Sequence, residues 1–329
     1  MPRRLRPPAL PHLDRSLLGH PQGRHRLALA LLLFCAPVAA QEAQFTASTR
    51  LALIEASAHA ADGKPLASLT PEDFLITEND VSLTPSQIAR DELPLDLVLV
   101  IDTSGSMFSN ISRIAGGAHA ALSALRPGDR IALLSFNHRS RWRHPLSADF
   151  SSVEAALNAL VRKKNFGGGT TLNTPIHRAA QQLRSAASPA RRRAILILTD
   201  GVGEKGTRSN TVLKQLWEAD TTLNAILMRP SRTLRGIQIA NRILKPYSVV
   251  LDASVEDLAQ KTSGEVMRFD DSPRILAEML TRIRSRYTLY YPPPDSPAKE
   301  RKVSATLSPS GKARFPGATA LGRRQYLVP

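Results

Sequence analysis

Residues 95–107 read LDLVLVIDTSGSM, and this stretch decides the fold. It opens with a largely apolar run that ends at Ile101, which is typical of a strand buried on both faces by helices. Three oxygen-bearing side chains follow at alternate positions, Asp102, Ser104 and Ser106, and Gly105 lets the backbone turn sharply among them. We therefore expect these oxygens to point toward one place just beyond the end of the strand.

The region around this stretch alternates between apolar strands and helical segments. Strands are predicted at 95–101, 130–136, 141–145, 194–199, 223–228 and 265–269, and helices at 111–126, 150–163, 174–187, 209–219, 255–262 and 273–285. Runs such as AILIL at 194–198 read as strands covered on both faces. The alternation predicts an α/β fold with a doubly wound, mostly parallel sheet over residues 95–286.

Two β-rich flanks enclose this region, at residues 41–94 and 287–329. In the first, apolar residues recur at period two over 45–53, Asp62-Gly63 is typical of a hairpin turn, and LTPEDF at 69–74 predicts one helical turn. In the second, KVSATL at 302–307 alternates apolar and polar side chains. Each flank alone is small for a stable core, so we expect them to pair into one discontinuous β-rich domain.

The first 40 residues show the pattern of a secretory signal peptide. Basic residues at 24–26 precede LALALLLFCAPVAA, an apolar segment that ends in small residues before Gln41. We expect residues 1–40 to be removed, which places the mature chain outside the cell or in the periplasm. The alternative is an uncleaved membrane anchor, and only then would the protein contact a membrane. The single cysteine, Cys35, lies in this segment, so the mature chain is predicted to have no disulfide.

The 329-residue chain has a formal net charge of +16. A basic excess of this kind suits nucleic acid, anionic lipid or polysaccharide as a partner, or simply a well-solvated basic surface. The sequence has neither zinc-finger spacing nor an aromatic-plus-basic RNA motif. We therefore do not expect a nucleic-acid partner.

Two further loops offer the same chemistry as the 102–106 stretch. FGGGTTLNTPI at 166–176 places Thr170 after three glycines, and LILTDG at 196–201 places Asp200 directly after a buried strand. Two carboxylates and three hydroxyls suit a hard dication such as Mg²⁺, with Mn²⁺ or Ca²⁺ as alternatives. Thr171 also follows the glycines, and Thr170 is favoured because Leu172 and Ile176 then lie on the core face of the next helix.

These three motifs together resemble the metal-ion-dependent adhesion site of von Willebrand factor A-type (VWFA) domains. The resemblance covers about residues 95–286, and the flanks more loosely resemble a secreted bacterial subgroup of proteins that contain such domains. It implies that Ser104, Ser106 and Thr170 bind the metal directly and that Asp102 and Asp200 bind mostly through water. A Glu or Asp of a partner protein would complete the coordination.

The predicted function is an exported, metal-dependent binding module of the adhesion type that captures a partner carboxylate, without catalysis. One alternative is a structural envelope protein in which the cation only stabilises loops. A metal-assisted hydrolase is the other, but the chain has no G-x-S-x-G or H-E-x-x-H motif and no evident general base. Phe108, Met107 and Phe166 are the expected apolar rim of the site.

Two basic segments fall outside this assignment. In NHRSRWRH at 137–144, Arg139, Arg141 and Arg143 share one face of a predicted strand. They either protect a sheet edge from aggregation or form a basic rim that attracts an acidic partner. Residues 229–248 form a long basic insertion with no predicted position.

Overall fold

A computed structural model describes residues 51–90, 92–161, 165–186, 188, 191–201, 206–228, 254–269, 271–295, 300–322 and 325–327. These belong to one compact unit that spans residues 48–329. The predicted signal peptide and the insertion at 229–248 lie outside the described residues.

The centre of the predicted α/β region is a six-stranded sheet in the order β10-β9-β8-β5-β6-β7. Its strands are β5 (Leu95–Asp102), β6 (Arg130–Phe136), β7 (Ser140–Ser147), β8 (Arg192–Thr199), β9 (Thr222–Leu227) and β10 (Val266–Arg268). Neighbouring strands run parallel except β7, which pairs antiparallel with β6 at the edge. Every residue of β5 is buried, as expected for a central strand covered on both faces.

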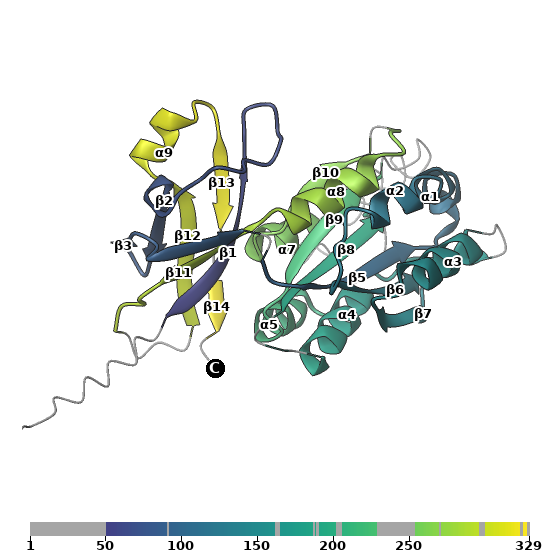
Figure 1. The fold of residues 1–329 in the computed structure, drawn as a ribbon. Coiled ribbons are helices and arrows are strands. Elements are labelled where there is room, and N and C mark those ends of the chain that lie inside the picture. Colours follow the sequence, from purple (N-terminus) through teal and green to yellow (C-terminus); the bar gives the residue numbers. More distant parts are fainter. Residues whose placement is uncertain are drawn as a thin grey trace, which may run out of the picture. The chain divides into compact units, whose positions relative to one another are not determined.

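Helices cover both faces of this sheet (Figure 1). One face packs against α1 (Phe108–Ala115), α2 (Ala118–Leu122), α3 (Phe150–Leu160) and α8 (Ile275–Arg284), and the other against α4 (Asn173–Ser185), α5 (Ser209–Glu218) and α7 (Val255–Lys261). Alternate residues of β5 supply the two cores, with Leu97 and Leu99 on the first face and Val98 and Val100 on the second. The predicted doubly wound, mostly parallel sheet is confirmed.

The prediction of one continuous helix over 111–126 is wrong. A short 3-10 turn (Gly105–Met107) leads into α1, and the chain then breaks at Gly116 and Gly117 before α2 begins. A side chain at Gly117 would bring its Cβ within 2.3 Å of the Pro273 carbonyl oxygen. The break thus lets another segment approach the backbone, a long-range contact that local periodicity does not reveal.

The two flanks form a pair of four-stranded antiparallel sheets. Their orders are β13-β1-β11-β4 and β14-β12-β2-β3. The strands are β1 (Ala52–His59), β2 (Phe74–Glu78), β3 (Val81–Leu83), β4 (Gln87–Arg90), β11 (Tyr287–Tyr291), β12 (Glu300–Leu307), β13 (Thr319–Gly322) and β14 (Gln325–Leu327), with a helix α9 (Pro309–Arg314) and a helical turn (Pro71–Asp73). N-terminal β1 pairs with C-terminal β11 and β13, and β2 pairs with β12.

These two sheets share one apolar core. It contains Ile54, Ala56, Ala58, Phe74, Ile76, Tyr287, Leu289, Tyr291, Val303, Ala305 and Leu307. The expected discontinuous β-rich unit is therefore observed, although the exact domain boundaries stay predictions. The apolar face read at 45–53 is only partly described, and its Leu51 and Leu53 are 47% and 41% exposed, so the opposite face of β1 supplies the core.

The predicted Asp62-Gly63 turn in this β-rich unit forms as expected. Gly63 has a positive φ, and Lys64 donates its backbone N–H to the Asp62 carboxylate over 3.1 Å. Asn79 and Asp80, which join β2 to β3, have φ values of 47° and 68°. Both residue types tolerate this left-handed region, and the hairpin closes here without glycine.

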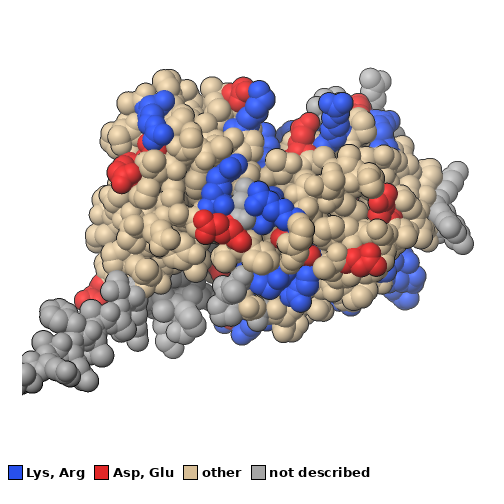
Figure 2. All heavy atoms as spheres, in the orientation of Figure 1, with Lys and Arg blue, Asp and Glu red and all other residues tan. Residues whose placement is uncertain are grey.

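Charges of both signs are interspersed on the face drawn in Figure 2. In the described ranges, no helix is both long and apolar enough to cross a lipid bilayer.

Candidate metal centre

The predicted site lies at the carboxyl edge of the six-stranded sheet. β5 and β8 are parallel neighbours, paired residue by residue from Leu95 with Arg192 to Ile101 with Leu198. Asp102 ends β5 and Asp200 directly follows β8, so the sheet register itself brings the two carboxylates to the same edge.

Four of the five predicted ligands are linked by short polar contacts. Ser106 Oγ donates to Asp200 Oδ2 over 2.7 Å, and the hydroxyl oxygens of Ser104 and Ser106 lie 3.3 Å apart. The backbone N–H of Ser104 donates to Asp102 Oδ1 over 2.8 Å. Oxygens from segments about a hundred residues apart in sequence thus converge on one place.

Thr170 lies on a loop that is tied to the same edge. The backbone N–H of Gly167 donates to the Thr103 carbonyl over 2.9 Å, and that of Thr171 donates to the Asn137 carbonyl over 3.0 Å. The Thr170 residue is 9% exposed. Among the described residues no hydrogen bond joins it to the other four, so its part in the site, and the choice between Thr170 and Thr171, stay predictions.

Burial dominates the electrostatics of Asp102. It is completely buried, and this loss of solvation raises its pKa to about 6, against the hydrogen bonds from Ser104 and Thr199. The nearby Asp200 raises the pKa further. In the part of the chain that the structure describes, no lysine, arginine or histidine forms an ion pair with Asp102. A positive charge beside this carboxylate would favour its ionised form.

Sequence reasoning missed a supporting residue, Thr199. Its hydroxyl donates to Asp102 Oδ2 over 2.7 Å and accepts from the backbone N–H of Gly201 over 3.0 Å. Thr199 therefore fixes both the first carboxylate and the turn that carries Asp200. A hydroxyl residue directly between an apolar strand and an aspartate was the available signal.

One of the three expected rim residues is not at the rim. Met107 is completely buried in the core under α1 and α8, because the short turn at 105–107 directs it into the domain. Phe108 and Phe166 are half-buried and pack edge to face, with ring centroids 5.2 Å apart. This aromatic pair joins the start of α1 to the glycine loop.

The donor set is poor in carboxylates and rich in hydroxyls. Within the described ranges, His, Cys, Asp and Glu form no group of three or more that could hold a metal. The site fits a hard dication that keeps water and accepts neutral oxygens better than it fits a zinc site of histidines and cysteines.

Comparison with known proteins gives a family match and sequence relatives. The family described as von Willebrand factor type A domain matches residues 97–202, a range that contains all five predicted ligands. Inter-alpha-trypsin inhibitor heavy chain H2 of Sus scrofa is 31% identical over 126 residues, and vitrin of Bos taurus is 24% identical over 152 residues. The first match covers 35% of this chain and 14% of the relative, and the second covers 42% and 23%.

Solved structures include likenesses at low identity. The von Willebrand factor type A structure from Catenulispora acidiphila is 14% identical, covers 84% of this chain and 73% of its own, and gives a TM-score of 0.43. The conserved hypothetical protein BatB from Bacteroides thetaiotaomicron is 14% identical, covers 57% and 97%, and gives a TM-score of 0.41. Residues 97–202 of this chain therefore match the von Willebrand factor type A domain family.

Proposed function

We propose that this domain holds a divalent cation, Mg²⁺ or alternatively Mn²⁺ or Ca²⁺, and uses it to capture a carboxylate of a partner protein without catalysis. Ser104, Ser106 and Thr170 would bind the cation directly, and Asp102 and Asp200 would bind it mostly through water. The observation that carries the proposal is the convergence of Asp102, Ser104, Ser106 and Asp200 oxygens at one edge of the sheet.

The residues of the chain have distinct parts in this proposal. Asp102 is held by the Ser104 N–H and the Thr199 hydroxyl, so its carboxylate cannot rotate freely. Ser104 and Ser106 offer neutral oxygens that do not cancel the charge of a cation. A divalent cation supplies a positive charge that keeps a coordination position for an external oxygen.

The surroundings favour a carboxylate partner. With only two carboxylates in the donor set, a bound dication keeps enough positive character to attract a third. The Phe108–Phe166 pair provides an apolar wall near the glycine loop, and partial exclusion of water strengthens a charge interaction there. Animal relatives of this domain belong to longer proteins, so the partner itself is not carried over from them.

Export forms the second half of the proposal. The basic start, apolar centre and small-residue end of residues 24–40 support a cleaved signal peptide. The test is N-terminal sequencing of the mature protein after expression with residues 1–40 present, with Gln41 as the expected first residue. A retained N-terminus would favour the membrane-anchored alternative.

The metal proposal is tested by calorimetric titration of Mg²⁺ and Mn²⁺ into residues 41–329. We expect binding by the wild type and its loss in Asp102→Ala and in Asp200→Ala. Asp149→Ala is the matched control, because Asp149 caps α3 through Ser152 and lies outside the site. Circular dichroism shows whether each variant is folded. Unchanged binding in both site variants would overturn the proposal.

Two further outcomes separate the alternatives. If chelator lowers the melting temperature but alters no binding of acidic peptides, the cation only stabilises loops. If the protein hydrolyses esters or phosphoesters in a Mg²⁺-dependent way, the non-catalytic part of the proposal is wrong.

A further inference from the structure

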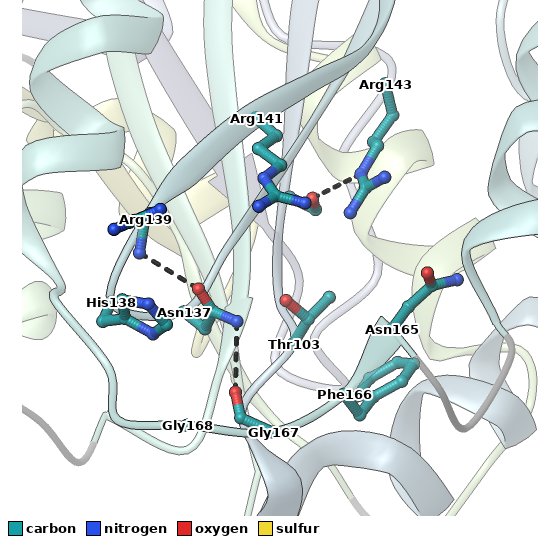
Figure 3. Close-up of a pocket in the computed structure, with 11 residues that line it drawn as sticks. Thr103, Asn137, His138, Arg139, Arg141, Arg143, Asn165, Phe166, Gly167 and Gly168 are labelled. Atoms are coloured by element: carbon teal, nitrogen blue, oxygen red, sulfur yellow. Dashed lines mark hydrogen bonds between the residues drawn. The ribbon is translucent and has the colours of Figure 1, made fainter.

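Figure 3 shows a polar hollow whose wall includes Thr103 and Gly167, from loops that also carry predicted metal ligands. Its volume is about 270 Å³. Its walls come from β6, β7, the loop after β5, the loop between β6 and β7 and the loop after α3. They contain Thr103, Ser135, Asn137, His138, Arg139, Arg141, Arg143, Asn165, Phe166, Gly167 and Gly168. A partner side chain therefore has room to enter.

The charges that line this hollow are of one sign. Among the described residues, three arginines and a histidine contribute to its wall, and no aspartate or glutamate does. Arg141 and Arg143 project from the same face of β7 over the hollow, as Figure 3 shows. In the ranges described, none of Arg139, Arg141 and Arg143 forms an ion pair with a carboxylate.

The register of the sheet explains this arrangement. On one face of β6, Ile131 and Leu133 face the core, and the next residue on that face is the buried Ser135. Ser135 pairs with Arg141 on β7, and its hydroxyl accepts from Arg143 Nε over 2.7 Å. Ser135 therefore occupies a position where this face of β6 is otherwise apolar, and its hydroxyl holds the Arg143 guanidinium above the hollow.

The neutral groups of the wall already have partners. Asn137 Nδ2 donates to the Gly167 carbonyl over 3.1 Å, and Asn137 Oδ1 accepts from the Arg139 N–H over 3.0 Å. Asn165 Nδ2 donates to carbonyls at the end of α3. The two Nη groups of Arg143 and the guanidinium of Arg141 make none of the hydrogen bonds seen among the described residues, and they face the hollow. Burial, with the nearby Arg141, lowers the pKa of Arg143.

Parts of the wall of the hollow are adjacent in sequence to predicted metal ligands. Thr103 lines the hollow and sits in the chain between the predicted ligands Asp102 and Ser104. Gly167 and Gly168 line it from the loop that leads to Thr170, and Gly167 is bonded to the Thr103 carbonyl. One extended segment could therefore reach both places.

Protection of the sheet edge is the competing explanation for these arginines. Charged residues on an edge strand such as β7 discourage pairing with another sheet, and lysine serves this purpose as well as arginine. A carboxylate between two guanidiniums instead uses the planar, two-pronged donor geometry that lysine lacks. The two explanations therefore differ in what an Arg-to-Lys change should do.

We propose that this hollow is a second subsite for the partner, which binds a carboxylate side chain of an acidic peptide segment between Arg141 and Arg143. This inference rests on the proposed function, because a neighbouring acidic residue of the same segment would occupy the metal site. The domain then recognises paired acidic residues rather than a single one.

The test uses fluorescein-labelled peptides in a Gly-Ser background that carry either one Glu or two Glu separated by one to four residues. Binding to residues 41–329 is measured by fluorescence anisotropy in Mg²⁺ and in EDTA. In Mg²⁺ at low salt, at least one two-Glu spacing should bind about tenfold more tightly than the one-Glu peptide. That tenfold preference corresponds to about 1.4 kcal/mol.

The deciding variant is Arg141→Gln with Arg143→Gln. It should lose the preference for two Glu but keep calorimetric Mg²⁺ binding and one-Glu binding. Arg141→Lys with Arg143→Lys should lose most of the preference although the charge is kept. The control, Lys214→Gln with Lys312→Gln, removes two exposed charges from α5 and α9 and should retain it.

The outcomes distinguish the two proposals. A two-Glu preference that survives Arg141→Gln with Arg143→Gln, or that is absent from the wild type, overturns the subsite. The same holds if no peptide binds a protein that binds Mg²⁺. One-Glu binding that is unaffected by EDTA, with no Mg²⁺ heat in calorimetry, instead overturns the proposed metal function.

Discussion

The two ends of strand β5 each carry a buried aspartate, but the two carboxylates have different partners and pKa values shifted in opposite directions. Asp96, near the start, is 1% exposed and accepts from Arg130 and Arg191 at 2.6–2.8 Å. Burial alone would raise its pKa, but the two arginines outweigh burial and lower it. Asp102, at the end, is held by neutral donors, and burial raises its pKa to about 6.

The difference separates structural charge from functional charge. At the amino end the protein supplies the cations itself, since Asp129 also pairs with Arg284 over 3.2 Å. At the carboxyl end a desolvated carboxylate is surrounded by hydroxyls. A buried charge without a matching partner is costly, and an external cation removes this cost. We therefore interpret the first end as a fixed part of the fold and the second as a ligand site.

The largest expected effect comes from neutralising each aspartate in turn. Asp96→Asn should lower the free energy of unfolding by about 3 kcal/mol, because it leaves two arginines without their carboxylate. Asp102→Asn should leave it unchanged or raise it slightly in EDTA, because it removes an unfavourable buried charge. Urea unfolding at pH 7 measures both, and equal losses would break the comparison.

Mg²⁺ should then stabilise Asp96→Asn but not Asp102→Asn. At a concentration of about 100 Kd, a ligand that binds only the folded state adds about 2.7 kcal/mol. The wild type and Asp96→Asn should both gain this amount, whereas Asp102→Asn should gain nothing. The shift of the urea midpoint on adding Mg²⁺ is the measurement, and a gain by Asp102→Asn would contradict it.

The pH dependence provides a finer test. The pKa of Asp102 is higher in the folded state than in the unfolded chain, so the folded state binds more protons between about pH 4 and 6. In EDTA, lowering the pH from 7 to 5 should therefore stabilise the wild type relative to Asp102→Asn by about 1 kcal/mol.

Two other groups do not disturb this difference. The lowered pKa of Asp96 keeps it ionised throughout that window, and its contribution is lost only at lower pH. His59, whose burial lowers its pKa, destabilises the fold below about pH 6.5, but equally in both proteins. In saturating Mg²⁺ the Asp102 effect should nearly disappear between pH 7 and 5, since the bound cation keeps the carboxylate ionised. A pH-independent difference in EDTA would contradict the prediction.

The smallest expected effect on the free energy of unfolding comes from removing one of the two arginines that pair with Asp96. Arg130 is 35% exposed in its side chain, whereas Arg191 is 18% exposed. Arg130→Met should cost only about 0.5 kcal/mol, because Arg191 still neutralises Asp96 and a solvated pair contributes little. Urea unfolding of the two single variants should show a larger loss of unfolding free energy in Arg191→Met than in Arg130→Met.

Much of this arrangement follows from local sequence. Apolar runs predicted β5, β6, β8 and β9 of the central sheet, because a strand covered on both faces has no polar face to obscure it. The alternation of strands with helices then places Asp102 and Asp200 at one edge. Their closeness follows from topology, which is why it could be predicted without coordinates.

Other features depended on contacts between distant segments. The break at Gly117 depends on the Pro273 carbonyl, and the burial of Met107 depends on how the 105–107 turn packs into the apolar core of the domain. The subsite arginines are visible in the sequence, but the Ser135 anchor requires the β6–β7 register, which includes an irregularity. Spacing along the chain carries none of this information.

The pairing of the chain's two ends has a consequence for the order of synthesis. β1 lies between β11 and β13, with Ala56 opposite both Tyr287 and Gly322. During translation β1 is synthesised early, but its partner strands β11 and β13 are synthesised more than 200 residues later. The six-stranded sheet between them can form before those partners are made. Because non-local strand pairing is slow and leaves edges exposed, the nascent N-terminal strands are the segment most in need of a chaperone.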